Sequence, residues 1–244
     1  MENYQESRRV DPVVREKLSS GALSFAKVFL YMFIGLAITT AVAFGIGYIF
    51  VTALNNGASG ETLSKAYLGL MISSAIVLII LSLIINFSAF ASRHSILVPA
   101  ILYCVVMGSL LSSFTIVVDW RILGMAFGIT SGIFLLMTLI AVFTKGNLSP
   151  LAMLGIGLIS GCLILTLVNF FLRSNTLAWV ISFALFAAVM FITMFDIWNI
   201  KKICERGEMS NNLSLYCAFS LYVDFIYILI RIIIFLLAIF GNRN

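Results

Sequence analysis

Residues 151–200 read LAMLGIGLISGCLILTLVNFFLRSNTLAWVISFALFAAVMFITMFDIWNI, and this stretch decides the fold. It contains two apolar runs, Leu151–Leu172 and Thr176–Ile200, with only the short connection RSN between them. Each run is as long as the roughly 20 residues that a helix needs to cross the hydrocarbon core of a bilayer. Because the connection is so short, the two helices must lie side by side and antiparallel.

The same pattern covers most of the chain. Five further apolar runs are Phe25–Leu54, Ala66–Phe90, Ile96–Val118, Ile122–Phe143 and Leu213–Phe240. They are continuous rather than alternating, which excludes the strands of a membrane β-barrel. Of the 244 residues 62% are hydrophobic and 10% are charged, against about 25% charged in soluble domains. The sequence therefore predicts an all-α, polytopic membrane protein. A single domain of seven transmembrane helices, residues 25–244, follows a cytoplasmic tail, residues 1–24.

The basic residues predict the orientation. With the N-terminus in the cytoplasm, ten lysines and arginines lie at the cytoplasmic ends of the helices and four lie at the opposite ends, and Arg231 remains inside the membrane. The positive-inside rule then favours a cytoplasmic N-terminus and a C-terminus outside. This distribution accounts for the net charge of +5 without a nucleic-acid partner. The polar N-terminal stretch does not resemble a cleavable signal peptide, and a bacterial plasma membrane is the expected location.

Glycines at four-residue spacing predict close contacts between helices. Gly124, Gly128 and Gly132 share one face of their run, and Gly157 and Gly161 share one face of the next. Small residues at this spacing let membrane helices approach closely. A glycine-lined passage is the alternative interpretation.

The four cysteines form no CxxC pair, and three of them lie within apolar runs. They are typical of small packed hydrophobic residues rather than of a disulfide framework or a zinc site. We therefore expect no bound cofactor.

Two carboxylates and one guanidinium interrupt the last two runs. Asp196 lies near the end of the sixth run, and Asp224 and Arg231 lie within the seventh. A charged side chain at the centre of a bilayer costs about 2.5–3.5 kcal/mol on insertion scales. Such residues therefore face other helices or water, and they often mark paths for ions or protons.

Asp196 and Asp224 are the predicted functional pair. Their helices are consecutive and antiparallel, so the two carboxyl groups can meet, provided that the sixth helix projects beyond the membrane or the seventh begins outside it. Two carboxyl groups in contact do not both ionise readily, and they titrate as one unit that shares a proton. Arg93 and Arg231 are the candidate gating cations. A buried polar clamp that only fixes helix packing is the alternative role for this cluster.

Four segments resemble the transmembrane Bax inhibitor motif (Bax inhibitor-1) family in its bacterial form. In chain order they are SFAKVFLYMFIGLAITTAVAF, VFTKGNLSPLAMLGIGLISG, FALFAAVMFITMFDIWNIKKI and LSLYCAFSLYVDFIYILIRI, and together they cover the chain from about Phe25 to Asn244. The last one resembles the family's most distinctive helix. Three departures are Phe195 in place of a tyrosine, Tyr227 in place of an asparagine, and Arg231 about one turn early.

The resemblance implies a seven-helix fold in which the other six helices enclose the last one. It also implies a pH-sensitive calcium leak channel that an aspartate pair, here Asp196 and Asp224, gates by protonation. Arg93 best fits the arginine that switches the family between closed and open arrangements. Calcium is then the transported ion and protons are the regulator. Two carboxylates make a weak calcium site, because calcium prefers six to eight oxygen ligands, and a weak site suits conduction.

Other functions remain open from the sequence. A non-conducting membrane regulator that binds another membrane protein is one alternative. A proton-coupled transporter would need internal repeats, and no clear repeat is present. An intramembrane aspartyl protease also uses two aspartates on adjacent helices, but LYV precedes Asp224 where such proteases have glycine-x-glycine. We therefore expect that the chain is not an enzyme.

Overall fold

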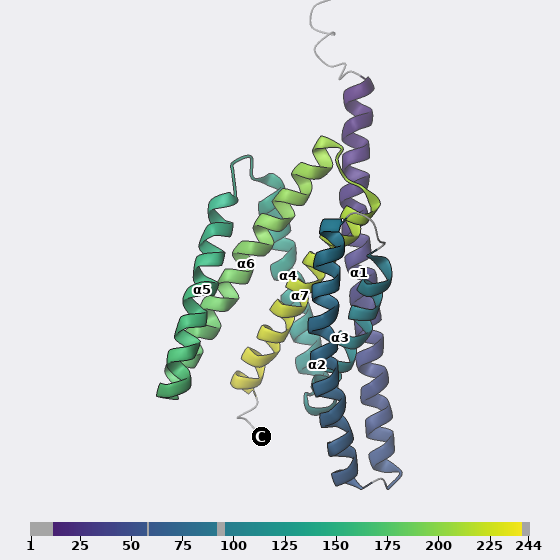
Figure 1. Cartoon of the computed structure of the whole chain (residues 1–244), viewed down its shortest axis with the longest axis vertical. Helices are drawn as coiled ribbons and strands as arrows, with labels where there is room; N and C mark the ends of the chain where they lie inside the picture. The colour runs from purple at the N-terminus through teal and green to yellow at the C-terminus, as the bar shows by residue number, and fades with distance from the viewer. Residues whose placement is uncertain (1–11, 58, 92–95, 241–244) are drawn as a thin grey trace, which may run out of the picture.

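A computed structural model of the chain describes residues 12–57, 59–91 and 96–240, and its seven apolar runs are seven α-helices (Figure 1). The helices are α1 (Pro12–Asn55), α2 (Gly60–Ala91), α3 (Leu97–Val117), α4 (Trp120–Phe143), α5 (Ser149–Leu172), α6 (Asn175–Arg206) and α7 (Asn211–Phe240). All seven are long and apolar enough to cross a membrane. The prediction of an all-α protein with seven spans is confirmed.

Local polar contacts start and end the helices. Asp119 precedes α4, and its carboxylate accepts a hydrogen bond from the Arg121 amide at 3.0 Å. Ser174 plays the same part for α6, where its hydroxyl accepts from the Leu177 amide at 3.4 Å. Gly207 ends α6 in the left-handed conformation, with φ of 76°, which glycine adopts without a steric penalty. These contacts make short turns between long helices.

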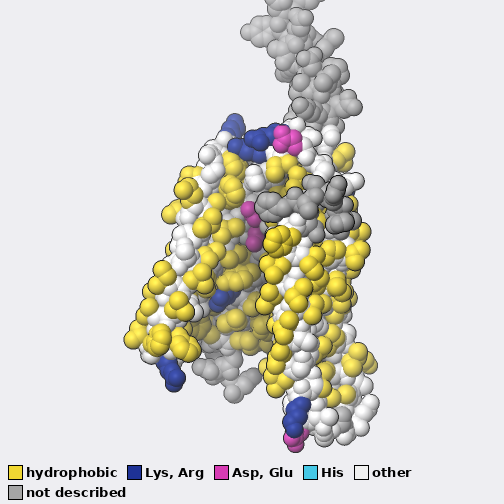
Figure 2. Space-filling model, viewed as in Figure 1, with side chains coloured by type: hydrophobic (Ala, Val, Ile, Leu, Met, Phe, Trp, Pro, Cys, Tyr) yellow, Lys and Arg dark blue, Asp and Glu magenta, His cyan; other side chains and the backbone are white. Residues whose placement is uncertain are grey.

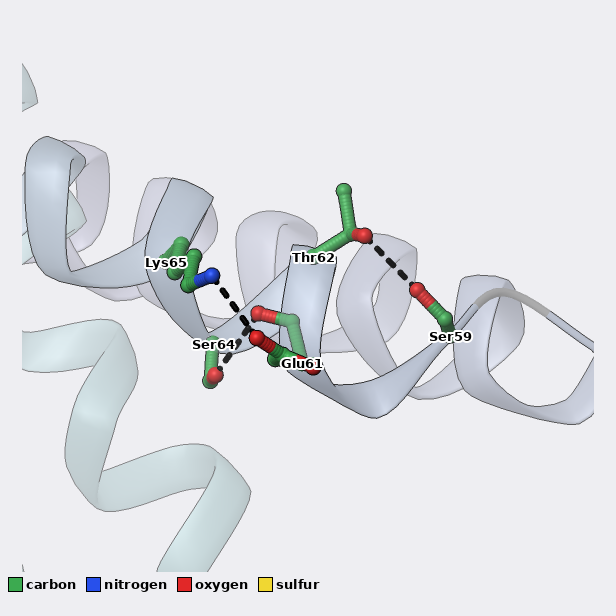
Figure 3. A network of polar contacts seen from close by, with 5 residues as sticks. All are labelled: Ser59, Glu61, Thr62, Ser64 and Lys65. Atoms are coloured by element: carbon green, nitrogen blue, oxygen red, sulfur yellow. Dashed lines mark hydrogen bonds and ion pairs between the residues drawn. The ribbon is translucent and has the colours of Figure 1, made fainter.

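The start of α2 carries a small polar network (Figure 3). Lys65 forms an ion pair with Glu61 at 2.7 Å, and the Ser59 hydroxyl donates to Thr62 at 2.7 Å. The Glu61 side chain lies in the first turn, where a negative charge interacts favourably with the helix dipole and stabilises the helix. Both charged side chains are largely exposed, so the pair stabilises the end of the helix only modestly.

Helix α7 lies at the centre of the packing. It contacts α1, α2, α3, α4 and α6, whereas among the described helices α5 contacts only α6 (Figure 1). Four α7 side chains, Leu221, Tyr222, Phe225 and Ile228, are almost fully buried. The enclosure of α7 therefore involves five neighbouring helices, and α6 separates it from α5.

Two predicted boundaries fall inside longer helices. Helix α1 begins at Pro12, so the expected boundary at residue 24 lies within it. Helix α6 continues six residues beyond Ile200, to Arg206. Its final turns pack against neighbouring groups, since Lys201 Nζ donates to the Val142 carbonyl at 2.6 Å and Lys202 Nζ lies 3.7 Å from the centre of the Trp198 ring. We call this side of the molecule the α6–α7 end and the opposite side the α1–α2 end.

The expected close contacts at the glycine faces of α4 and α5 are wrong. A Cβ atom at any of these glycines would meet no atom within 4 Å; the positions are Gly124, Gly128, Gly132, Gly157 and Gly161. Close approach occurs elsewhere. A Cβ atom at Gly108 of α3 would lie 2.7 Å from the Thr39 carbonyl oxygen, and one at Gly155 of α5 would lie 2.7 Å from Ile192. Glycine spacing identifies a smooth helix face but does not identify which face has a neighbour.

All four cysteines, Cys104, Cys162, Cys204 and Cys217, are buried and free of disulfides. This agrees with their interpretation as small packed residues.

Candidate functional site: a carboxyl pair between α6 and α7

Polar residues form a stripe along one face of α7. Ser220, Asp224, Tyr227 and Arg231 follow one another at spacings of four, three and four residues, which place them on one side of a helix. The other side of α7 carries the buried apolar residues of the core. The stripe faces α6, because its members form hydrogen bonds and electrostatic contacts with α6 side chains.

The structure brings Asp196 and Asp224 together. The Ser220 hydroxyl donates to Asp196 Oδ2 at 3.1 Å across the two helices. Asp224, one turn further along α7, interacts electrostatically with Asp196 and lies beside the hydroxyl of Thr193. Each carboxyl group therefore faces a hydroxyl of the opposite helix, and the two carboxyl groups are staggered by about one turn.

The length of α6 makes this contact possible. Asp196 lies ten residues before the end of α6, and Asp224 lies thirteen residues after the start of α7. At 1.5 Å per residue, these positions are about 15 Å and about 20 Å from the connection between the helices. The two depths nearly match because α6 remains helical through Lys201 and Lys202 to Arg206. A helix that ended at Ile200 would have kept the carboxyl groups apart.

The Asp224 carboxyl group is enclosed. Within the described residues, its Oδ2 atom is buried and accepts no hydrogen bond. The nearby Thr193 hydroxyl donates to its own helix, to the Val189 carbonyl at 2.8 Å. A buried carboxylate oxygen without a donor is costly, whereas a protonated carboxyl group carries its own donor. The site is therefore suited to a group that gains and loses a proton.

Arg231 lies on the same face of α7 but makes different contacts. Its Nη2 atom donates to the Tyr227 hydroxyl at 2.9 Å and its Nη1 atom donates to the Ser182 hydroxyl of α6 at 3.3 Å. In the described part of the chain no carboxylate forms an ion pair with it. The guanidinium is thus held by neutral groups, and the Cα atoms of Arg231 and Asp224 are about 10.5 Å apart along the helix axis.

The second candidate cation, Arg93, lies outside the described residues.

The surface of the molecule has a hollow beside α6. In the described ranges helix α6 has no contact with α2 or α3, and Figure 2 shows a hollow between these helices in which acidic and basic side chains are visible. Asp196 and Asp224 are the acidic residues of the described helices that lie far from the helix ends. No cluster of three or more His, Cys, Asp or Glu side chains suited to a metal ion occurs within the described ranges. A cation at this pair would have two carboxyl groups and must take its other ligands from elsewhere.

A contact on the far side of α7 holds the helix in place. The Tyr222 hydroxyl lies 2.6 Å from the Thr39 hydroxyl of α1, and Thr39 also donates to the Cys104 carbonyl of α3 at 3.1 Å. Tyr222 is almost fully buried. Because Tyr222 and Asp224 are two residues apart, this three-helix contact helps to set the position of the carboxyl group.

Comparison with known proteins identifies the family. The sequence pattern of the family described as "Inhibitor of apoptosis-promoting Bax1" matches residues 22–244. The chain belongs to the Bax inhibitor family. The resemblance seen in four separate segments is thus confirmed over almost the whole chain, and it includes both helices of the carboxyl pair.

Curated bacterial proteins share this similarity. The inner membrane protein YbhL of Escherichia coli K12 is 30% identical over 227 residues, which cover 90% of this chain and 91% of that protein. An uncharacterised protein of Borreliella burgdorferi is 29% identical over 228 residues, 90% of this chain and 91% of its own. No solved structure matches the chain. Membership of the Bax inhibitor family and seven spanning helices show that this is an integral membrane protein.

Sequence reasoning missed several partners at the site. Three hydroxyl partners were not expected: Thr193 and Ser182 of α6, and Ser220 of α7, which donates to Asp196. The stripe on α7 could have been found from its spacing. The partners on α6 depend on the register between two helices, which spacing within one helix does not encode.

Proposed function

We propose that this member of the Bax inhibitor family is a pH-sensitive calcium leak channel gated by protonation of Asp196 and Asp224. The observation that carries the proposal is the placement of these two carboxyl groups about one turn apart at the α6–α7 contact, with one Asp224 oxygen buried and without a donor among the described residues. Intramembrane acids in such positions commonly serve ion or proton paths.

The gating step is a change in the shared proton. At low pH the pair retains a proton, the carboxyl groups remain together and α7 stays against α6. As the pH rises the proton leaves, and two carboxylates in a region of low dielectric constant repel each other. Separation of the pair then opens a path along the contact between α6 and α7. Arg93 completes the switch by taking one carboxylate as its partner in the open arrangement.

Calcium fits this site as a passing ion rather than as a bound one. Calcium prefers six to eight oxygen ligands, and the pair supplies at most four carboxylate oxygens. The remaining ligands are waters, so the ion binds weakly and leaves readily, as conduction requires. Arg231 adds a positive charge further along the same face of α7 and limits the entry of cations from the α1–α2 end.

The orientation of the protein is part of the proposal. The excess of basic residues near the α6–α7 end supports its placement in the cytoplasm. Figure 2 shows several of these basic side chains together at that end. The C-terminus then lies outside the cell, and the membrane is the plasma membrane of a bacterium.

Calcium flux into proteoliposomes, measured from acidic to mildly alkaline pH, tests the proposal. The parent chain is compared with Asp196→Asn and Asp224→Asn. Because an amide cannot ionise, we expect both variants to lose the rise in flux with pH that the parent chain shows. Glu205→Gln is the matched control, since Glu205 lies on the same helix, is exposed, and should leave the profile unchanged. An unchanged profile in both aspartate variants would refute gating by this pair.

A non-conducting regulator that binds another membrane protein is the second candidate function. Helix α5 favours it, because among the described helices α5 contacts only α6 and its glycine face is open. Small-residue faces are common at contacts between membrane helices. Activity in cells that survives loss of both carboxyl groups would support this function over the channel.

A further inference from the structure

A groove lies on the side of α7 opposite the carboxyl pair. Helices α1 and α4 both contact α7, and towards the α6–α7 end they approach each other, where the ring centres of Phe29 and Phe134 are 6.4 Å apart. Between them, towards the α1–α2 end, is a cavity of about 440 Å³ that α7 and α3 also line. This volume lies within the range of pockets that hold small ligands. Phe127 of α4 packs against Phe225 of α7, with ring centres 5.7 Å apart, beside the groove.

The groove is apolar and about one leaflet deep. On α1 it extends from Leu36 to Phe44, eight residues or about 12 Å along the helix. The hydrocarbon core of a bilayer is about 30 Å thick, so one leaflet contributes about half of that. Helix α7 contributes Ile226, Leu229 and Ile233 to the groove. The groove therefore fits a flexible hydrocarbon chain that runs along the helices.

The end of the groove near the turn between α3 and α4 carries a polar anchor. Trp120 lines the groove and is 74% exposed, and tryptophan is enriched at the interface between membrane and water. The guanidinium of Arg121 lies 5.8 Å from the centre of the Trp120 ring. The structure shows no ion pair of Arg121 within its described residues. Arginine binds phosphate groups strongly through paired hydrogen bonds.

We propose that this groove binds one glycerophospholipid from the leaflet at the α1–α2 end. One acyl chain occupies the space between α1 and α4, and the phosphate contacts Arg121. The depth and the apolar lining of the groove match an acyl chain, and the positive charge at its mouth matches the phosphate. This site is separate from the carboxyl pair and does not depend on the proposed channel activity.

The lipid would contact the back of α7. Ile226, Leu229 and Ile233 lie about 140° to 200° around the helix from Asp224, at 100° per residue. A bound chain therefore fills the space behind the face that carries the carboxyl group. It supports α7 where α1 and α4 leave a gap.

Two glycines of α4 provide a matched pair of variants. A Cβ atom at Gly124 or at Gly128 meets no atom within 4 Å, so a side chain can start at either position without a clash at its Cβ atom. Only Gly124 is part of the groove lining. Gly124→Leu places a side chain where the acyl chain would lie, whereas Gly128→Leu adds the same side chain to the same helix outside the groove. Equal thermal stability of the two variants in detergent will show that both are folded.

The test is native mass spectrometry of the detergent-purified full chain with added phosphatidylglycerol. We expect the parent chain and Gly128→Leu to retain one lipid, and Gly124→Leu to lose it. The leucine side chain takes up the space of the acyl chain, and the displaced chain loses its packing contacts with the groove, although it stays in the apolar interior of the detergent. Arg121→Gln should also lower retention, and diacylglycerol, which lacks the phosphate, should be retained weakly by every variant.

A photoreactive group on the acyl chain locates the bound lipid. We expect cross-links to the groove residues of α1, α4 and α7. Equal retention by Gly124→Leu and Gly128→Leu would overturn the proposal, as would cross-links spread evenly around the bundle. Unchanged retention in Arg121→Gln, or equal retention of diacylglycerol, would overturn the phosphate contact.

Discussion

If the proposed channel conducts cations past the carboxyl pair, replacement of Arg231 by glutamine should change its selectivity for calcium over potassium. Arg231 lies about 10.5 Å along α7 from Asp224, and only the neutral groups of Tyr227 and Ser182 hold its guanidinium. The positive charge therefore acts on any cation that reaches the carboxyl pair. Its effect on a divalent ion is twice its effect on a monovalent ion, which separates this electrostatic effect from a general loosening of the structure.

The expected size follows from Coulomb's law. With an effective dielectric constant of about 20, and with the axial separation of the two Cα atoms, about 10.5 Å, taken as the separation of the charges, Arg231 raises the energy of Ca²⁺ at the pair by about 3 kcal/mol and that of K⁺ by about 1.6 kcal/mol. Removal of the charge therefore favours calcium over potassium by about 1.6 kcal/mol, or more than about tenfold. Salt reduces this figure, because charges separated by about 10 Å are partly screened at physiological ionic strength.

The assay is calcium and potassium flux into the same proteoliposomes at low and high ionic strength. Arg231→Lys retains the charge and should leave the ratio of the two fluxes unchanged. Ser182→Ala removes one neutral hydrogen bond and should also leave that ratio unchanged. If Arg231→Gln raises both fluxes by the same factor, the electrostatic reasoning is wrong, because a wider path would be the simpler cause. An unchanged ratio with unchanged fluxes would place Arg231 away from the ion path.

Two further predictions concern stability. Gly108→Ala should lower the free energy of unfolding by about 1–3 kcal/mol, because the added Cβ atom would lie 2.7 Å from the Thr39 carbonyl oxygen. The control is Gly132→Ala, which adds a methyl group to open space. Thermal unfolding in detergent measures the stability of both variants. Tyr222→Phe removes the hydroxyl that lies 2.6 Å from the Thr39 hydroxyl and should lower the free energy of unfolding by about 0.6–1.7 kcal/mol, the range of hydrogen bonds between membrane helices. An equal effect of Tyr222→Phe in a Thr39→Val background would show that the two hydroxyls do not interact.

The spans could be predicted because the bilayer sets their length and composition. An uninterrupted apolar run of about 20 residues is typical of a helix that crosses a membrane. Most helix boundaries lie close to the ends of the runs, but α1 begins at Pro12, well before Phe25. The end of α6 could not be predicted in the same way. Lys201 and Lys202 resemble the flank of a span, yet the helix continues because Lys201 caps the end of α4 at the Val142 carbonyl and Lys202 lies over Trp198. The first contact joins residues that are far apart in the sequence, and the second joins two residues on one face of α6. Hydropathy predicts neither of them.

The carboxyl pair could be predicted from the free-energy cost of a charged side chain in the membrane rather than from geometry. A charge within a span requires a partner. Because two such charges lie on consecutive helices, each could be predicted to be the partner of the other. The hydroxyls of Thr193 and Ser220 could not be assigned, since either helix could slide by a turn without a change in its own pattern. The contacts of Arg231 with Ser182 and Tyr227 depend on the same register.

The contacts of α7 indicate which of its sides separates if the pair repels. Towards α1, the hydroxyls of Tyr222 and Thr39 are 2.6 Å apart and Lys27 donates to Asn211 at 2.7 Å. Towards α6, the hydrogen bonds are longer, 3.1 Å from Ser220 to Asp196 and 3.3 Å from Arg231 to Ser182. Shorter hydrogen bonds hold α7 to α1, while the contact with α6 contains the groups whose charge changes. Repulsion between the carboxylates therefore acts on the weaker of the two contacts, and the movement expected on deprotonation is the separation of α6 from an α7 that stays with α1.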